Sequence, residues 1–403
     1  MIKNTFYIFA GRASNALFLF LLTLVVSRQL GPALFGVFSF LTTVMVSASC
    51  FSSLGLDIWM VREVTREPFK DKLYLSNVLG LKIGTSLLII LLVFLTFKAT
   101  NLPHTTLYLL WVLSVSLLFN SISQTLWHYG DCFKQFIFHS SLWAFSNIIK
   151  SLLGVVLVLL YQELEPLIWG VVVAEAISMT LSYCVIRHRF GPFVPDFQFA
   201  VWKDFLTRSA PIGVGMIFSV LYFRLDIVML QLLTEEKVVG FYSAAYKLFE
   251  VAVVMPHSLM LVLFPTLVEE FHTNRFKFQN SYKKALVIYS MTGGAIALVL
   301  WGFSPEIISL VYGDKFIPSV GLLEILAWAV LLFFVNYLLS NVLIISGQEK
   351  VNSWNLVGTT VLNIILNLFW IPKYGAIGAA WATLICEFGL IAVLSLQVRK
   401  MFK

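Results

Sequence analysis

The chain alternates long apolar runs with short stretches rich in glycine, proline and charged residues. Most runs reach about 20 residues, the length that a helix needs to cross the hydrocarbon core of a bilayer. Dividing the chain at the polar stretches predicts twelve membrane-spanning helices and hence an all-α integral membrane protein. Their expected bounds are 5–29, 34–61, 73–97, 105–129, 137–160, 166–186, 204–232, 239–264, 281–303, 318–346, 351–370 and 375–398.

Composition agrees with this pattern. The 403 residues are 59% hydrophobic and 12% charged, whereas soluble domains carry roughly 25% charged residues. The first apolar stretch is too long for a signal-peptide core and has no small-residue cleavage site after it, so we expect it to be retained as a span. No segment between spans exceeds about 20 residues, which leaves no room for a soluble catalytic domain. We therefore expect the protein to act within the bilayer.

The distribution of basic residues predicts the orientation. Of the 28 Lys and Arg residues, 18 fall on the side of the two termini, five on the opposite side and five within the spans. Basic residues gather in cytoplasmic loops. Both termini are therefore expected in the cytoplasm.

The two halves of the chain resemble each other weakly. LGPALFGVFSF resembles LLTEEKVVGFYSAAY, which aligns Gly36 with Gly240, and PLIWGVVVAEA resembles YGAIGAAWATL, which aligns Gly170 with Gly378. Chance matches in apolar sequence are the alternative. A true repeat of six spans predicts two six-helix bundles, residues 1–195 and 196–403, related by a pseudo-two-fold axis along the membrane normal. Such halves commonly enclose a cavity and rock around it.

Charges inside the predicted spans are the main candidates for function. The five cations are Arg12, Lys82, Lys150, Arg224 and Lys247, and the six acids are Asp57, Glu175, Asp226, Glu250, Glu324 and Glu387. A central Lys, Arg or Asp costs about 2.5 to 3.5 kcal/mol at insertion, so the five cations oppose it by roughly 12 to 18 kcal/mol. Partners or water must offset this cost.

Arg224 and Asp226 are two positions apart, about 200° around a helix, so each needs its own partner. Interhelical ion pairs are one interpretation. The other places Arg224 against an anion in a wet cavity, with Asp226 orienting a cation or carrying a coupling ion. Lys247 and Glu250 are three positions apart and could pair, although Lys247 lies at a depth that would let it share a cavity with Arg224.

The remaining charges divide between binding and structural roles. Lys150 has no acid within one turn, which favours the cavity, whereas Arg12 and Lys82 could extend to the membrane surface. Asp57, close before Arg62, fits a gate or a local ion pair equally well. Glu175 and Glu387 stand in the last span of each half, and each is a candidate for a functional role. His128 and His257 could carry protons, but packing is more typical of a lone histidine.

No motif indicates covalent chemistry, a metal or a cofactor. The four cysteines stand singly, and nucleotide-binding loops, GxSxG and HExxH are missing from the sequence. Several cations in one cavity would instead favour an anionic, phosphorylated substrate, because arginine binds phosphate in a bidentate way. An ion gradient or the membrane potential is the expected driving force.

Three segments together resemble a known family. SRQLGPALFGVFSF followed by SLGLDIWMVREVTR, then LYFRLDIVMLQLLTEEKVVGFYSAAYKL, and finally YGAIGAAWATLICE are similar to polysaccharide transport proteins. These are the O-antigen and related flippases of the multidrug/oligosaccharidyl-lipid/polysaccharide exporter superfamily. The resemblance extends over the chain and is strongest in these segments.

The resemblance implies a MATE-like pair of bundles that moves an undecaprenyl-pyrophosphate-linked oligosaccharide across the bacterial inner membrane by alternating access. Arg12, Lys150, Arg224 and Lys247 would then hold the pyrophosphate or acidic sugars, and Asp57, Asp226 and Glu175 would serve ion coupling or gating. The expected partners are this substrate, membrane lipids and other polysaccharide-assembly proteins, with no nucleic acid and no cofactor.

Two alternatives share part of this evidence. A multidrug or organic-cation antiporter of the same superfamily would have the same fold but would favour an acidic cavity. A membrane enzyme of polysaccharide assembly, such as a polymerase or ligase, would usually carry a sizeable external loop, which the pattern lacks. A non-enzymatic flippase is therefore the leading hypothesis.

Overall fold

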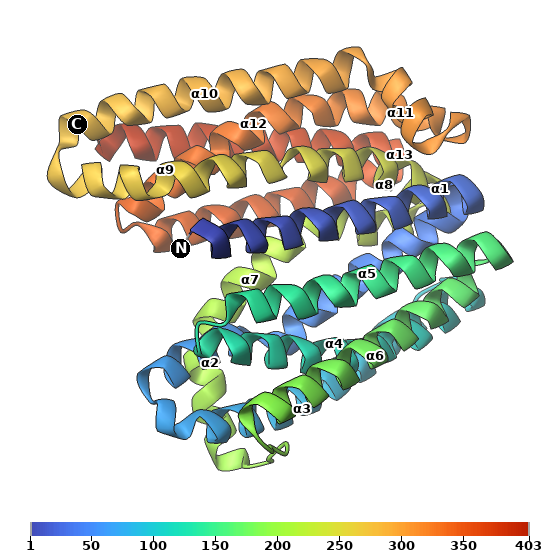
Figure 1. Cartoon of the computed structure of the whole chain (residues 1–403). Coiled ribbons are helices and arrows are strands. Elements are labelled where there is room, and N and C mark those ends of the chain that lie inside the picture. The colour runs from blue at the N-terminus through green and yellow to red at the C-terminus, as the bar shows by residue number, and fades with distance from the viewer. Residues whose placement is uncertain (1, 402–403) are drawn as a thin grey trace. The chain divides into compact units, whose positions relative to one another are not determined.

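The computed structural model describes residues 2–401, with side chains from residue 18 onward, and every regular element in that range is a helix (Figure 1). The prediction of an all-α membrane protein is thus confirmed. The elements are α1 (Ile2–Ser53), α2 (Leu56–Arg66), η1 (Pro68–Lys70), α3 (Asp71–Lys98), α4 (His104–Cys132), α5 (Phe136–Tyr161), α6 (Leu164–Phe190), α7 (Phe199–Leu233), α8 (Glu236–Ala252), α9 (Val254–Thr273), α10 (Arg275–Gly302), α11 (Ser304–Tyr312), η2 (Asp314–Ser319), α12 (Val320–Ile345) and α13 (Glu349–Met401).

Within residues 18–401, ten helical stretches are long and apolar enough to cross a membrane. Two of them hold 49 and 53 residues, far more than the roughly 20 that one crossing requires. The 53-residue stretch contains two predicted spans, and the 49-residue stretch contains span 34–61 and the end of span 5–29, whose earlier part lies in the same helix α1. The ten stretches thus correspond to the twelve predicted crossings.

A glycine separates the two spans in each long stretch. Gly31 has φ 76° and ψ −179°, and Gly375 has φ 56° and ψ −135°. Glycine adopts this left-handed region at little cost, whereas other residues are strained there. A Cβ at Gly378 would lie 2.6 Å from the carbonyl oxygen of Trp370, eight positions earlier, a closeness that a straight helix cannot provide. Figure 1 shows the chain folding back at the far end of the dark blue helix that begins α1.

Two of the predicted spans are each broken into two helices. Within span 34–61, helix α1 ends at Ser53 and α2 begins at Leu56, after Leu54 and Gly55 in left-handed conformations. Within span 239–264, the break lies at Val253, between α8 and α9. Both breaks fall in the second span of a half. Hydropathy along the sequence does not reveal these two breaks, because the side chains remain apolar on both sides of each break.

The chain divides into two compact units, Met1–Val220 and Leu221–Lys403, with the division inside α7. The predicted boundary at 195/196 falls in the segment between α6 and α7, and this segment packs onto the first unit. The backbone N–H of Asp196 donates to the carbonyl of Ser76 (2.9 Å), and Asp196 lies so close to Gly80 that a Cβ there would meet its oxygen at 2.0 Å. Phe205 of α7 then packs on Trp59, with ring centroids 4.4 Å apart.

The first unit buries polar groups inside and presents leucine outside. Along α3, one face is exposed and apolar, as suits contact with lipid tails. Its members are Leu87, Leu88, Leu91, Leu92 and Leu95. The other face carries the buried polar side chains Lys82 and Ser86. Membrane helices pack this way because only the interior offers hydrogen-bond partners.

In the second unit, α12 is the most enclosed helix. Leu326, Val330, Phe334 and Leu338, among others, are fully buried, and α10 and α13 lie beside it (Figure 1). Glycine permits close approach here too, since a Cβ at Gly293 of α10 would meet the ring of Phe334 at 2.9 Å. This helix forms the framework on which the polar groups of the second unit are held.

The turn before α2 generates a stability prediction. A Cβ at Gly213 of α7 would meet the backbone carbonyl carbon and oxygen of Leu54 at 2.5 and 2.6 Å, whereas a Cβ at Gly215 meets nothing within 4 Å. Gly213→Ala is therefore expected to destabilise the protein by about 1 to 3 kcal/mol, and Gly215→Ala to leave it unchanged. Thermal unfolding in detergent, followed by tryptophan fluorescence, measures both, and equal melting temperatures would contradict the predicted contact.

Candidate functional site

A fully buried ion pair joins α2 to α3 in the first unit. Lys82 Nζ lies 2.7 Å from Asp57 Oδ2, which also accepts from the hydroxyl of Ser53 (2.9 Å), while Thr125 of α4 donates to Asp57 Oδ1 (2.9 Å). Both charges therefore have partners. The expectation that Lys82 extends to the membrane surface is wrong, because its side chain is only 1% exposed. The nearest acid to Arg62 is Glu63, at 3.0 Å, rather than Asp57.

A second polar cluster in the first unit involves four helices. Lys150 of α5 pairs with Glu175 of α6, and Asn120 of α4 donates to both oxygens of Glu175 at 3.3 Å. Gln124 donates to the amide oxygen of Asn120 (2.7 Å) and to Ser49 of α1 (3.4 Å). Lys150, which has no acid within its own turn, thus finds one on the next helix.

Two cations meet at one carboxylate in the second unit. Arg224 of α7 approaches Glu250 Oε1 at 2.5 Å, and Lys247 of α8 donates to Glu250 Oε2 at 2.8 Å. The sequence suggested the pair of Lys247 with Glu250, and the structure confirms it. It also brings Arg224 to the same acid, so that Arg224 and Lys247 lie together as their depth indicated. Two positive charges on one carboxylate leave one positive charge without a contacting counter-ion in this group.

Asp226 points away from Arg224, as their spacing requires. Its Oδ2 accepts from the hydroxyl of Tyr242 on α8, and its buried Oδ1 contacts no donor among the described side chains. On α13, Glu387 Oε1 accepts from Tyr222 (2.5 Å), and Asn336 of α12 donates to its Oε2 (2.8 Å). Both carboxylates are held by neutral donors, which allows a proton or a cation to bind without breaking an ion pair.

Exposure separates the four intramembrane cations whose side chains are described. Lys82 is 1% exposed, whereas Lys150, Arg224 and Lys247 are 19%, 25% and 36% exposed. Only the latter three can reach a ligand without unfolding their surroundings. Arg12, the fourth predicted binding residue, lies outside the described side chains.

Sequence reasoning missed the partners that come from distant helices. The pairing of Asp57 with Lys82 joins positions 25 apart, and Tyr222 reaches Glu387 across 165 positions. The available signal was the presence of tyrosine and asparagine in apolar runs, at Tyr222, Tyr242 and Asn336. Such residues commonly form hydrogen bonds between membrane helices.

The sequence matches two family models. The model described as "Polysaccharide biosynthesis protein" matches residues 1–271, and the one described as "MatE" matches residues 211–369. The capsular polysaccharide biosynthesis protein CapF of Staphylococcus aureus is 21% identical over 395 residues, covering 96% of each chain. The probable low-salt glycan biosynthesis flippase Agl15 of Haloferax volcanii is 23% identical over 235 residues, 57% of this chain and 48% of that protein.

The fold also resembles a solved transporter. The lipid II flippase MurJ in its inward closed conformation superposes with a TM-score of 0.78 at 17% sequence identity, covering 99% of this chain and 88% of that one. At this identity the likeness concerns the fold alone. It agrees with the predicted two-lobe architecture of twelve helices.

The buried pair generates a prediction that separates structure from function. Lys82→Met leaves the Asp57 charge buried without its cation and is expected to cost about 3 to 5 kcal/mol. Replacing both partners, as Asp57→Asn with Lys82→Met, removes both charges and should restore most of the folded yield. Size-exclusion chromatography of detergent extracts measures that yield. A double variant as poorly folded as Lys82→Met alone would argue against the pairing.

Proposed function

We propose that this chain, which belongs to the polysaccharide biosynthesis protein family, is a flippase for a lipid-linked oligosaccharide. The family is part of the multidrug/oligosaccharidyl-lipid/polysaccharide exporter superfamily. The proposed substrate is an undecaprenyl-pyrophosphate-linked repeat unit of the O-antigen type. The proposed process is alternating access of the two bundles, without covalent chemistry. One relative named as a probable flippase, and a family model named for polysaccharide biosynthesis, support this proposal.

The observation that carries the proposal is the arrangement of two accessible cations around Glu250. Arg224 and Lys247 share this one carboxylate, so the group retains capacity for a further anion. In a low-dielectric environment, charge attraction is several times stronger than in water. A pyrophosphate offers several acceptor oxygens in the geometry that a guanidinium binds in a bidentate way.

Substrate binding then becomes an exchange of anions. The pyrophosphate takes the place of Glu250 at Arg224, and Lys247 contacts either anion. When the substrate leaves, Glu250 pairs with both cations again, so that neither Arg224 nor Lys247 lacks a contacting carboxylate in the empty transporter. Lys150 and Arg12 serve as further contacts for the pyrophosphate or for acidic sugars, with Glu175 as the resting partner of Lys150.

Asp226 is the proposed coupling carboxylate, and Asp57 and Glu175 are proposed to gate the first bundle. The unpartnered Oδ1 of Asp226 supports its role, because an ion binding there breaks no existing contact in the described residues. An ion gradient or the membrane potential drives transport. The excess of basic residues on the terminal side supports a multi-pass protein in the bacterial inner membrane with both termini in the cytoplasm.

Complementation tests the proposal. In cells that lack their own flippase and make a matching lipid-linked glycan, the protein is expected to restore surface polysaccharide. Arg224→Ala removes charge-assisted bonds worth about 1.5 to 3 kcal/mol each, so transport should fall about ten- to hundredfold. The readout is surface polysaccharide at equal membrane abundance of parent and variant.

Arg208→Ala is the matched control, because Arg208 stands on the same helix in an exposed pair with Asp204. It should transport normally. Equal activity of Arg224→Ala and Arg208→Ala would refute the binding role of Arg224. Failure of the parent with several glycans, together with lowered drug accumulation, would favour the antiporter instead.

Glu250→Gln provides a second test of the anion exchange. Removing the competing carboxylate should tighten binding of a soluble pyrophosphate-bearing substrate analogue and slow its release, since both cations are then free. Binding is measured on purified protein by calorimetry, with Glu67→Gln as a control at an exposed ion pair with Lys70. Unchanged or weaker binding in Glu250→Gln would contradict the exchange.

A further inference from the structure

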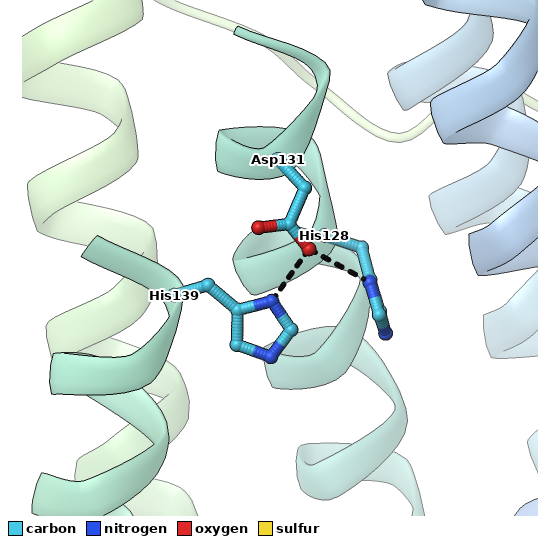
Figure 2. A group of neighbouring side chains, drawn as sticks. All are labelled: His128, Asp131 and His139. Atoms are coloured by element: carbon cyan, nitrogen blue, oxygen red, sulfur yellow. Dashed lines mark hydrogen bonds and ion pairs between the residues drawn. The ribbon is translucent and has the colours of Figure 1, made fainter. Parts of the chain in front are cut away.

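Three side chains at the connection between α4 and α5 converge on one point (Figure 2). The Nδ1 atoms of His128 and His139 lie 3.2 and 2.6 Å from the same oxygen of Asp131, Oδ2. One ligand atom from each residue lies within 4.8 Å of the other two. These residues belong to none of the ion pairs assigned above to substrate binding or coupling.

The backbone holds these side chains in place. His128 and Asp131 are three positions apart on α4 and therefore share a face, and His139 stands in the first turns of α5. Only Phe133 to Gln135 connect the two helices. Lys134 adopts φ 59°, and the N–H of Gln135 donates to the carbonyl of Gly130 at 3.1 Å. A short, hydrogen-bonded connection places the three donors together before any ligand arrives.

The donor set is that of a transition-metal site. Two imidazole nitrogens and one carboxylate oxygen suit zinc and its neighbours, whereas magnesium and calcium prefer oxygen alone. Bonds of 2.0 to 2.1 Å to a tetrahedral ion place ligand atoms about 3.3 Å apart. The 3.2 Å separation already fits this value, and the 2.6 Å separation must lengthen when an ion binds.

Electrostatics also favours a cation here. Asp131 stands in the last turn of α4, where the partial negative charge of the helix end disfavours a carboxylate and favours a cation. The second oxygen of Asp131, Oδ1, is buried and contacts no donor within the described side chains.

The cluster is open to ions from solution. All three residues are partly exposed, unlike the buried pair of Lys82 and Asp57. Cys132 is not a fourth ligand in this arrangement, because its sulfur faces the carbonyl of His128 at 3.6 Å. Three protein ligands leave a coordination position for water or an external group.

We propose that His128, Asp131 and His139 bind one divalent transition-metal ion, with zinc the best match, and that the ion fastens the end of α4 to the start of α5. Both helices continue into the first unit's polar cluster, where α4 carries Asn120 and α5 carries Lys150. Metal binding at the connection therefore stabilises the α4–α5 hairpin. This inference stands apart from the proposed flippase activity and is tested without it.

Zinc binding is measured on the purified full-length protein in detergent, with any polyhistidine tag removed, by competition with a zinc-binding dye. The expected result is one zinc ion per chain with micromolar or tighter affinity. Asp131→Asn and His139→Ala each remove a zinc ligand. Loss of a residue that only contacts a ligand lowers metal affinity 10- to 100-fold, so these two changes should lower zinc affinity by more than that. Cobalt substituted for zinc should show visible absorption bands that both variants lose.

His188→Ala is the matched control, because His188 is exposed at the end of α6 and outside the cluster. It should bind zinc like the parent. Zinc should also raise the melting temperature of the parent but not that of Asp131→Asn. Equal melting temperatures of the two proteins in the presence of a chelator would show that the variant is folded. Zinc binding by the parent no stronger than by the His128→Ala/His139→Ala double variant would overturn the proposal.

Discussion

The free-energy cost of a charge inside a membrane is the constraint on which the helix packing of this protein depends. Each of the four intramembrane cations with a described side chain contacts a carboxylate, and for Lys82, Lys150 and Arg224 that contact joins two helices. For Lys247 the link is indirect, since its partner Glu250 also holds Arg224 of the neighbouring helix. Because an unpaired charge costs several kcal/mol at this depth, these contacts restrict which helices can pack together and in what register.

The two units meet this constraint differently. In the first, Lys82 with Asp57 and Lys150 with Glu175 form balanced pairs that hydroxyl and amide groups complete. In the second, two cations share Glu250, while Asp226 and Glu387 are held by tyrosine and asparagine instead of by cations. Balanced pairs stabilise a fold, whereas unbalanced groups can exchange one ligand for another. The residues proposed for anion exchange at Glu250 and for ion coupling at Asp226 belong to the second, unbalanced kind.

Glycine residues hold helices together in a second way, because they let two backbones come close without any charged group. Gly55 and Gly213 bring the turn before α2 against α7, and Gly80 admits the linker at Asp196. Hydrophobic packing gives membrane helices little preference over lipid, so these close backbone contacts and the buried polar pairs supply the specificity between them. At the α4–α5 connection, His128 and His139 both contact Asp131, and the proposed zinc ion adds a third means of joining helices.

The sequence by itself determined the number and positions of the spans and the candidate charges, because apolar length and the high cost of intramembrane charge are local properties. The family followed from three segments that resemble its members. It also required Arg224 and Asp226 to face different partners, since helical geometry alone separates them. Only the tertiary structure decided which acid each cation meets. The buried state of Lys82, the sharing of Glu250 and the meeting of His139 with Asp131 depend on contacts between helices, and hydropathy along one chain does not encode them.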